Sequence, residues 1–278
     1  MTHDPAALAA AAPLLLLGAG KMGGALLAGW LDGGLDASDV IAVDPSPAPE
    51  MAAFLAARGV RHETAVPDDL TARVAVVAVK PQTMGAALPA LKAALGAESL
   101  VVSIAAGTTL AAFAGAFGEQ PVVRAMPNTP AQVGRGVTVC VANALVEDAD
   151  RALAEALLAA VGSVDWVGDE ALIDAVTAVS GSGPAYVFLL AECLAEAGVK
   201  AGLPRPLAER LARGTVSGAG ELLYRSELPA ETLRRNVTSP GGTTAAALAV
   251  LAAEEGLPRL MTQAVAAAAA RSRELAEG

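Results

Sequence analysis

The stretch LLLLGAGKMGGALLAGWL, residues 14–31, constrains the fold more than any other, because its hydrophobic period changes once, at a cluster of glycines. Four leucines predict a buried strand, and apolar residues at helical spacing after the glycines predict a helix. Gly18, Gly20 and Gly23 fit G-x-G-x-x-G: the first permits a tight turn, the second lets the backbone approach a pyrophosphate, and the third lets helix and strand pack. A dinucleotide phosphate is therefore expected at this helix start. The alternative is a glycine turn that only packs an α/β unit.

An acidic residue ends the second predicted strand, VIAVD. Asp44 lies 21 residues past Gly23, where an acceptor for a ribose hydroxyl belongs. The Ser46 hydroxyl and nearby backbone amides would instead suit a 2'-phosphate, which Asp44 would repel. No arginine lies between Asp44 and Arg58, which favours NADH slightly. The choice between NADH and NADPH stays open here.

Three further apolar runs predict strands of a parallel sheet, whose carboxyl ends face a common cleft. The first covers residues 73–82 and is ended by Lys80 and Pro81; the others cover 100–104 and 122–125. Small residues follow the second, and a stiff Pro-Asn-Thr-Pro loop follows the third. These loops could line a nicotinamide pocket. The plain alternatives are a lysine stem covering apolar surface and a rigid turn.

Two added strands, GVTVCVA and SVDWVG, flank the helical pattern DADRALAEALLAAVG, and beyond Gly168 nearly everything predicts helix. A kink or break is expected near Gly181, Gly183 and Pro184. We therefore predict an α/β protein with three parts: a flexible tail over 1–12, a dinucleotide-binding domain over 13–168 and an all-helical domain over 169–278. The alanine-rich helices of the last part predict a homodimer or larger assembly.

A second candidate site is NVTSPGGTTAAALAVL. Ser239 and Pro240 predict the N-cap and first residue of a helix. The N–H groups of the next four residues, Gly241, Gly242, Thr243 and Thr244, would then be open to a carboxylate, and Asn236 could orient the loop or the ligand. The Thr244 hydroxyl would lie about one turn inside. An ordinary capped helix is the alternative.

Composition excludes several classes. The net charge of -10, without a run of lysine or arginine, argues against nucleic acid and anionic membranes as partners. No signal peptide is apparent, so Cys140 and Cys193 are expected to be reduced, buried thiols in a cytoplasmic protein, and no metal site is predicted. His3 and His62, the only histidines, are poor candidates for an acid or ligand.

The residues missing from the second half bear on chemistry. Beyond residue 168 there is no histidine, and Lys200 is the only lysine. Reduction of a carbonyl needs a positioned acid, usually one of these types. An imine can carry its proton before hydride arrives, so a hydroxyl such as that of Thr244 and a carboxylate clamp suffice, with the hydride chemistry left to the nicotinamide.

The motifs GAGKMG, AVKPQ, SIAAGTT, RAMPNTP, SGSGPAYVF, EAGVKAGLPRPLAERLA and NVTSPGGTTAAALAVL resemble pyrroline-5-carboxylate reductases, from Leu14 to the end of the chain. The resemblance implies reduction of 1-pyrroline-5-carboxylate to L-proline by NADPH or NADH, the last step of proline biosynthesis. It also implies a Rossmann domain followed by a helical dimerisation domain that interleaves with its partner's, often in a decamer of five dimers.

The resemblance implies that Ser239 and the amides of Thr243 and Thr244 bind the substrate carboxylate, with the Thr244 hydroxyl as the catalytic group at the ring nitrogen. With the helix-start residues named above, the predicted substrate site comprises Asn236, Ser239, Gly241, Gly242, Thr243 and Thr244. The resemblance also implies that the loops at Val79 to Pro81, Ala105 to Gly107 and Met126 to Asn128 surround the nicotinamide. With the glycine loop and the end of the second strand, the predicted cofactor site comprises Gly18, Gly20, Lys21, Met22, Gly23, Asp44, Ser46, Val79, Lys80, Pro81, Ala105, Ala106, Gly107, Met126, Pro127 and Asn128. Asp44 stands where many relatives carry a neutral or phosphate-accepting residue, which puts the usual NADPH preference in doubt.

Two other hypotheses differ in class. β-Hydroxyacid dehydrogenases also join a Rossmann domain to a helical one, but they use a helical lysine shortly after a glycine stretch, where this chain reads AYVFLLAEC. A non-catalytic dinucleotide sensor would need no anion site for a substrate.

Overall fold

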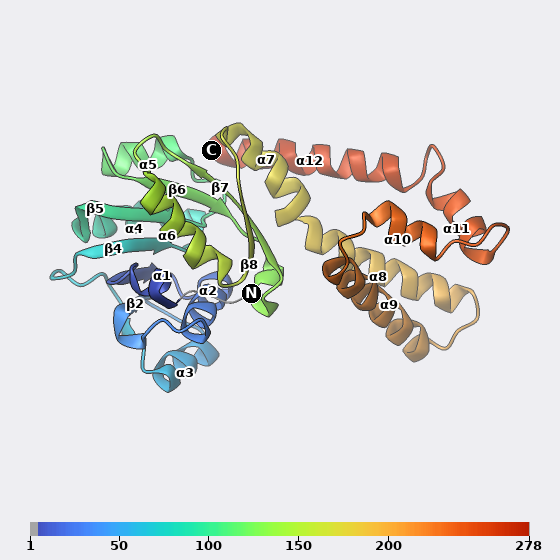
Figure 1. Cartoon of the computed structure of the whole chain (residues 1–278), viewed down its shortest axis with the longest axis horizontal. Helices are drawn as coiled ribbons and strands as arrows, with labels where there is room; N and C mark the ends of the chain where they lie inside the picture. Colours follow the sequence, from blue (N-terminus) through green and yellow to red (C-terminus); the bar gives the residue numbers. More distant parts are fainter. Residues whose placement is uncertain (1–4, 278) are drawn as a thin grey trace. The chain divides into compact units, whose positions relative to one another are not determined.

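The computed structural model describes residues 5–277. A first compact unit contains residues up to Gly181 together with those from Ala269 onward, and an eight-stranded sheet forms its centre (Figure 1). The strand order is β3-β2-β1-β4-β5-β6-β7-β8, and neighbouring strands are parallel except β6 and β7. The strands are β1 (Leu14–Leu17), β2 (Val40–Val43), β3 (Arg61–Glu63), β4 (Ala72–Val77), β5 (Leu95–Ser103), β6 (Val122–Met126), β7 (Gly136–Ala142) and β8 (Gly162–Trp166).

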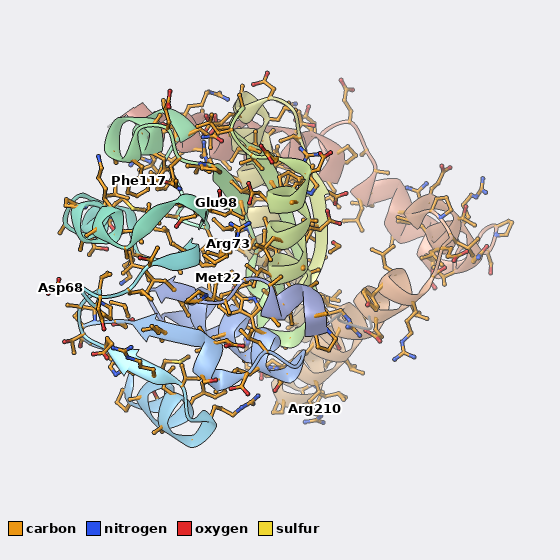
Figure 2. All side chains as sticks on the ribbon, turned by 60° about the vertical axis from the view of Figure 1, so that its left-hand side comes forward. Met22, Asp68, Arg73, Glu98, Phe117 and Arg210 are labelled. Atoms are coloured by element: carbon orange, nitrogen blue, oxygen red, sulfur yellow. The ribbon has the colours of Figure 1, made fainter. Side chains whose placement is uncertain are left out.

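The four leucines of β1 divide between the two faces of the sheet, as the alternation of a strand requires. Leu14 and Leu16 join one apolar cluster, and Leu15 and Leu17 join the other. The first cluster is covered by α1 (Pro5–Ala9), α2 (Lys21–Asp32), α3 (Pro49–Arg58) and α6 (Asp148–Ala159). The second is covered by α4 (Pro81–Ala93) and α5 (Leu110–Phe117), whose Phe117 is labelled in Figure 2. The predicted Rossmann domain is confirmed, although β4 ends at Val77, earlier than expected.

The N-terminal segment differs from the flexible tail predicted over residues 1–12. Pro5–Ala9 forms α1, and the Leu8 side chain is 1% exposed within the cluster that contains Trp30. The prediction is wrong for residues 5–12, because burial of this leucine and of Ala11 offsets the ordering entropy of a short helix. Residues 1–4 lie outside the described part of the chain.

The first unit also extends past the predicted boundary at Gly168. A 3-10 turn over Glu170–Leu172, the helix α7 (Ile173–Val176) and a π-helical turn over Thr177–Gly181 belong to it. Ile173 is 1% exposed. Burial of Ile173 and of Ala178, which is 0% exposed, anchors this segment to the first unit.

The second unit, Ser182–Ala268, is helical, as predicted. Its elements are α8 (Gly183–Lys200), α9 (Arg205–Arg225), α10 (Ala230–Asn236), α11 (Thr243–Leu251) and most of α12 (Leu257–Glu277). The expected break is present, since the π-helical turn ends at Gly181 and α8 starts at Gly183 with Pro184 in its first turn. At Gly198 an added Cβ would lie 3.3 Å from Ala208, so small residues permit close packing of α8 on α9.

Large apolar side chains are exposed on the helices of this unit, including Phe188 at 63% and Leu189 at 57%. The stretch Glu170–Lys200 is long and apolar enough to cross a membrane, with a mean hydropathy of 1.3, which is weak evidence for a span. Cys193 on α8 is exposed, which contradicts its predicted burial. Cys140 is buried as predicted, and burial together with the Glu155 carboxylate raises the pKa of its thiol to about 12.

Candidate active site

The glycine loop between β1 and α2 has the geometry that the motif requires. Gly18 has φ +97°, and a Cβ there would lie 2.8 Å from the Ala78 carbonyl oxygen. At Gly23 a Cβ would lie 2.1 Å from the Gly18 carbonyl oxygen. Gly20 has open space around it, with nothing within 4 Å. The first and third glycines therefore allow close packing, while the second leaves the approach to the backbone clear.

The start of α2 supplies unused donors. Gly20 is its N-cap without a side-chain hydrogen bond, and the first amide bonded within the helix is that of Gly24, which donates to Gly20 at 2.7 Å. The N–H groups of Lys21, Met22 and Gly23 therefore lack helical partners. Open donors at a helix N-terminus, next to a bare glycine, suit a pyrophosphate, so the residues present fit a dinucleotide.

A cavity of about 970 Å³ lies at this edge of the sheet, within the first unit. Its position matches the general rule, because the strand order reverses between β1 and β4 and ligands bind where the loops diverge. The predicted cofactor residues that line it are Gly18, Gly20, Lys21, Asp44, Ser46, Val79 and Lys80.

The Asp44 carboxylate is fixed by two backbone amides. Its Oδ2 accepts a hydrogen bond from the Ala19 N–H at 2.9 Å, and its Oδ1 accepts one from the Ser46 N–H at 2.9 Å. His62 Nε2 lies 2.8 Å from the Asp44 carbonyl oxygen, which can only accept, so this ring nitrogen is the donor. His62 thus supports the loop, in agreement with the expectation that it is not an acid.

Several lining residues were missed by sequence analysis. One face of α4 contributes Thr83, Ala86, Ala87 and Ala90, at helical spacing. Thr64, Ala65 and Val66 come from the loop after β3. The signals were present: small residues recur along α4, and the third strand of a parallel sheet must also end at this edge.

The other predicted cofactor residues do not line this cavity. Met22 packs on the core, Gly23 packs on the loop, and Pro81 begins α4. The remaining residues lie at the carboxyl ends of β5 and β6: Ala105, Ala106 and Gly107 follow β5, Met126 is the last residue of β6, and Pro127 and Asn128 follow it.

The Asn128 side chain connects elements that are far apart in the sequence. Its Nδ2 donates to the Ser180 carbonyl oxygen at 3.2 Å and lies 3.1 Å from the Ser180 hydroxyl, and its Oδ1 accepts from the Val137 N–H at 2.9 Å. The side chain is therefore occupied in joining the loop after β6 to the π-helical turn. Asn128 positions this loop, and any contact with a cofactor falls to the backbone.

The loop after β5 packs against the C-terminal end of α12. At Gly107, with φ +78°, an added Cβ would lie 3.4 Å from the Leu275 carbonyl oxygen in α12. The Ser272 hydroxyl donates to Asp174 Oδ1 at 2.7 Å, which fastens the end of α12 beside α7. The C-terminal residues thus support the predicted nicotinamide loop.

In the second unit, the predicted carboxylate site differs in detail from expectation. Ser239 is not a helix N-cap: Ser239 to Gly242 form a turn in which Gly242 N–H donates to Ser239 O at 3.1 Å, and Gly241 has φ +69°. Proline followed by a left-handed glycine is typical of a type II turn. Gly242 is the N-cap of α11, so the open amides are those of Thr243, Thr244 and Ala245.

The described residues contain no group of three or more histidine, cysteine, aspartate or glutamate side chains placed to hold a metal ion. A glycine loop at a helix start, an acid after the second strand and a separate helical unit define an NAD(P)H-dependent oxidoreductase of the Rossmann type. Residues 170–275 match the family model for pyrroline-5-carboxylate reductase dimerisation, and residues 14–107 match that for NADP oxidoreductase, coenzyme F420-dependent.

Named pyrroline-5-carboxylate reductases are similar to this chain over nearly its whole length. Pyrroline-5-carboxylate reductase of Pseudomonas aeruginosa is 45% identical over 270 residues, covering 95% of this chain and 97% of that protein. The solved reductase from Coxiella burnetii is 36% identical with a TM-score of 0.88, covering 95% and 98%. The Plasmodium falciparum enzyme, solved with NADP bound, is 30% identical with a TM-score of 0.79, covering 95% and 97%. This chain belongs to the pyrroline-5-carboxylate reductase family.

Proposed function

We propose that this chain reduces 1-pyrroline-5-carboxylate to L-proline with NAD(P)H, the last step of proline biosynthesis. The observation that carries the proposal is the cavity beside the glycine loop in a chain that is 45% identical to a named reductase over nearly its full length. A bound nicotinamide supplies the hydride that is added to the C=N carbon.

The cofactor is held by the first unit. The open amides of Lys21, Met22 and Gly23 receive the pyrophosphate, and Asp44 faces the ribose next to the adenine. The loops after β4, β5 and β6 surround the nicotinamide in this proposal, with Val79, Lys80, Ala105, Gly107 and Pro127 among their residues, and Met126 at the end of β6.

The substrate is held by the turn and helix start in the second unit. The amides of Thr243 and Thr244 and the Ser239 hydroxyl bind the carboxylate, with Gly241 and Gly242 leaving room for it and Asn236 orienting the loop. The Thr244 hydroxyl holds the ring nitrogen, which carries its proton before the hydride arrives. No histidine is needed for this step, in keeping with the engagement of His62 with the Asp44 carbonyl.

We further propose that the enzyme is a cytoplasmic homodimer, with no membrane or nucleic-acid partner, and that five dimers form a decamer. The exposed apolar side chains of α8, such as Phe188 and Leu190, favour burial against a second copy. Sedimentation analysis measures the assembly directly.

The test is an assay of NADH and NADPH oxidation with pyrroline-5-carboxylate as acceptor. We expect oxidation of a reduced nicotinamide with L-proline as the product. Cofactor binding without turnover of this substrate would contradict the reductase and favour a dinucleotide sensor. Turnover of a small hydroxy acid with an oxidised nicotinamide would favour the dehydrogenase alternative.

A further inference from the structure

We propose that this enzyme prefers NADH to NADPH, and that Asp44 determines the preference by receiving the 2'- and 3'-hydroxyls of the adenosine ribose. The inference rests on the proposed reductase function but concerns the cofactor site alone. An acid at the end of the second strand of a Rossmann sheet is suited to hydroxyl donors, whereas a nearby arginine suits a 2'-phosphate. The structure goes further than this rule, because it accounts for the other groups around the site.

The two amides that fix the Asp44 carboxylate also leave it free to accept more. Each oxygen takes one bond, from Ala19 N–H or Ser46 N–H, at 2.9 Å. A carboxylate has about four acceptor positions, so about two remain. Asp44 and Ser46 both line the cavity, and a rigid acceptor with open positions matches a pair of vicinal hydroxyls.

The loop after Asp44 is poor in donors for a phosphate. Pro45, Pro47 and Pro49 have no N–H. On sequence alone, the Ser46 hydroxyl and nearby backbone amides suit a 2'-phosphate. The Ser46 N–H is donated to Asp44, which leaves the Ser46 hydroxyl as a neutral donor in the cavity lining. The next open amides are those of Ala48 and of the first turn of α3, where Glu50 adds a second carboxylate to the cavity lining.

The two arginines that follow Asp44 most closely in the sequence are paired with other acidic residues. Arg58 pairs with Asp32 at 2.8 Å, with its guanidinium 5.6 Å from the Phe54 ring centroid, and Arg61 pairs with Glu63 at 2.8 Å. Within the described part of the chain, no arginine lines the cavity. Of its two lysines, Lys21 begins α2 and Lys80 ends the loop after β4, whereas the ribose would lie beside the loop after β2. A 2'-phosphate would therefore lie beside the carboxylates of Asp44 and Glu50, with no arginine in the cavity lining to neutralise it.

The test is isothermal titration of the full-length protein with NADH and with NADPH, in the absence of substrate. We expect NADH to bind at least about tenfold more tightly, since placing like charges together opposes binding. The ratio should narrow as salt increases, because the repulsion is screened. Equal binding, or tighter NADPH, would overturn the proposal even if the protein reduces pyrroline-5-carboxylate; conversely, the binding ratio can be as expected while that reaction is absent.

Two variants assign the preference. Asp44→Ser should remove or reverse the ratio, mainly by tightening NADPH. Asp68→Ser is the matched control: this exposed residue, labelled in Figure 2, precedes β4 and is not among the residues that line the cavity, so the ratio should stay that of the wild type. An unchanged ratio in a folded Asp44→Ser protein, checked by circular dichroism, would refute the role of Asp44. If this variant does not fold, Asp44→Asn removes the charge while keeping the size, and the same comparison applies.

Discussion

Glu170 and Arg124, the middle residue of β6, form an ion pair of 2.6 Å, and the same Glu170 oxygen accepts the Leu110 N–H at 2.9 Å. Arg124 is 7% exposed and Glu170 27% exposed as side chains. One carboxylate thus joins β6, the start of α5 and the segment that leads to α7. This pair holds the loops after β5 and β6, on which the proposed nicotinamide site depends.

We expect Glu170→Ala to lower the free energy of unfolding by about 2 kcal/mol, because it leaves a buried guanidinium and an amide without their acceptor. Urea unfolding followed by tryptophan fluorescence reports on this unit, since Trp30 and Trp166 both lie in it. Glu63→Ala, which removes an exposed pair with Arg61 in the same unit, should leave the urea midpoint unchanged. A Glu170→Ala midpoint equal to that of the wild type would contradict the role of the pair.

Substitution of two glycines in the loop between β1 and α2 should have different effects, one on the free energy of unfolding and the other on cofactor affinity. Gly23→Ala forces a Cβ to within 2.1 Å of backbone and should destabilise the protein by about 2 kcal/mol. Gly20→Ala meets nothing within 4 Å, so stability should change by less than about 1 kcal/mol. Its methyl group would instead obstruct the pyrophosphate, and NADH binding by titration calorimetry should weaken at least about tenfold. Wild-type affinity in Gly20→Ala would remove the pyrophosphate from this position.

Asn128 offers a test of the loop after β6. Asn128→Ala loses the bonds to Ser180 and Val137 and should cost about 2 kcal/mol in urea unfolding. Asn143→Ala is a matched control, because that side chain likewise hydrogen-bonds distant backbone with both ends of its amide, at Val122 N–H and the Gln120 carbonyl. Both variants should be destabilised, but only Asn128→Ala should lower kcat/KM at a temperature where both are folded. Equal kinetics in the two variants would mean that this loop does not reach the cofactor.

The sequence was sufficient for elements whose signal is local. The change of period at residues 14–31 indicated the strand, turn and helix, and the apolar runs indicated the strands of the sheet. The break before α8 followed from Gly181, Gly183 and Pro184. In each case a property of nearby residues, such as side-chain size or a missing N–H, determines the backbone.

Features that depend on distant partners were not predictable. α1 is too short to have a periodic signal, and its order depends on burial of Leu8 in a core formed by later residues. Ser-Pro-Gly-Gly satisfies both a helix start and a type II turn, and the structure has the turn. The hydrogen bond from the Ser46 N–H to the Asp44 carboxylate depends on the orientation of the Asp44 side chain, which the sequence does not specify. These contacts determine which of the predicted residues are free to bind a ligand.

In the proposed substrate site, removal of the Thr244 hydroxyl and removal of the Ser239 hydroxyl should change different kinetic constants. Thr244→Ala should lower kcat by about tenfold to a hundredfold, because a hydrogen bond to a charged nitrogen is lost, while NADH affinity is kept. Ser239→Ala should chiefly raise KM for pyrroline-5-carboxylate, because it removes a contact made equally in ground and transition states. Thr244→Ser, which restores the hydroxyl, should recover most of the turnover.

The control for these variants is Thr262→Ala, whose hydroxyl donates to the Pro258 carbonyl oxygen within α12 at 2.9 Å and is outside the proposed site. Steady-state kinetics with the imino acid varied at saturating cofactor distinguishes the two effects. Turnover of Thr244→Ala at the wild-type rate would exclude its hydroxyl from the reaction and leave the helix start at Gly242 with carboxylate binding alone. A lowered kcat with unchanged KM in Ser239→Ala would show instead that the turn acts only in the transition state.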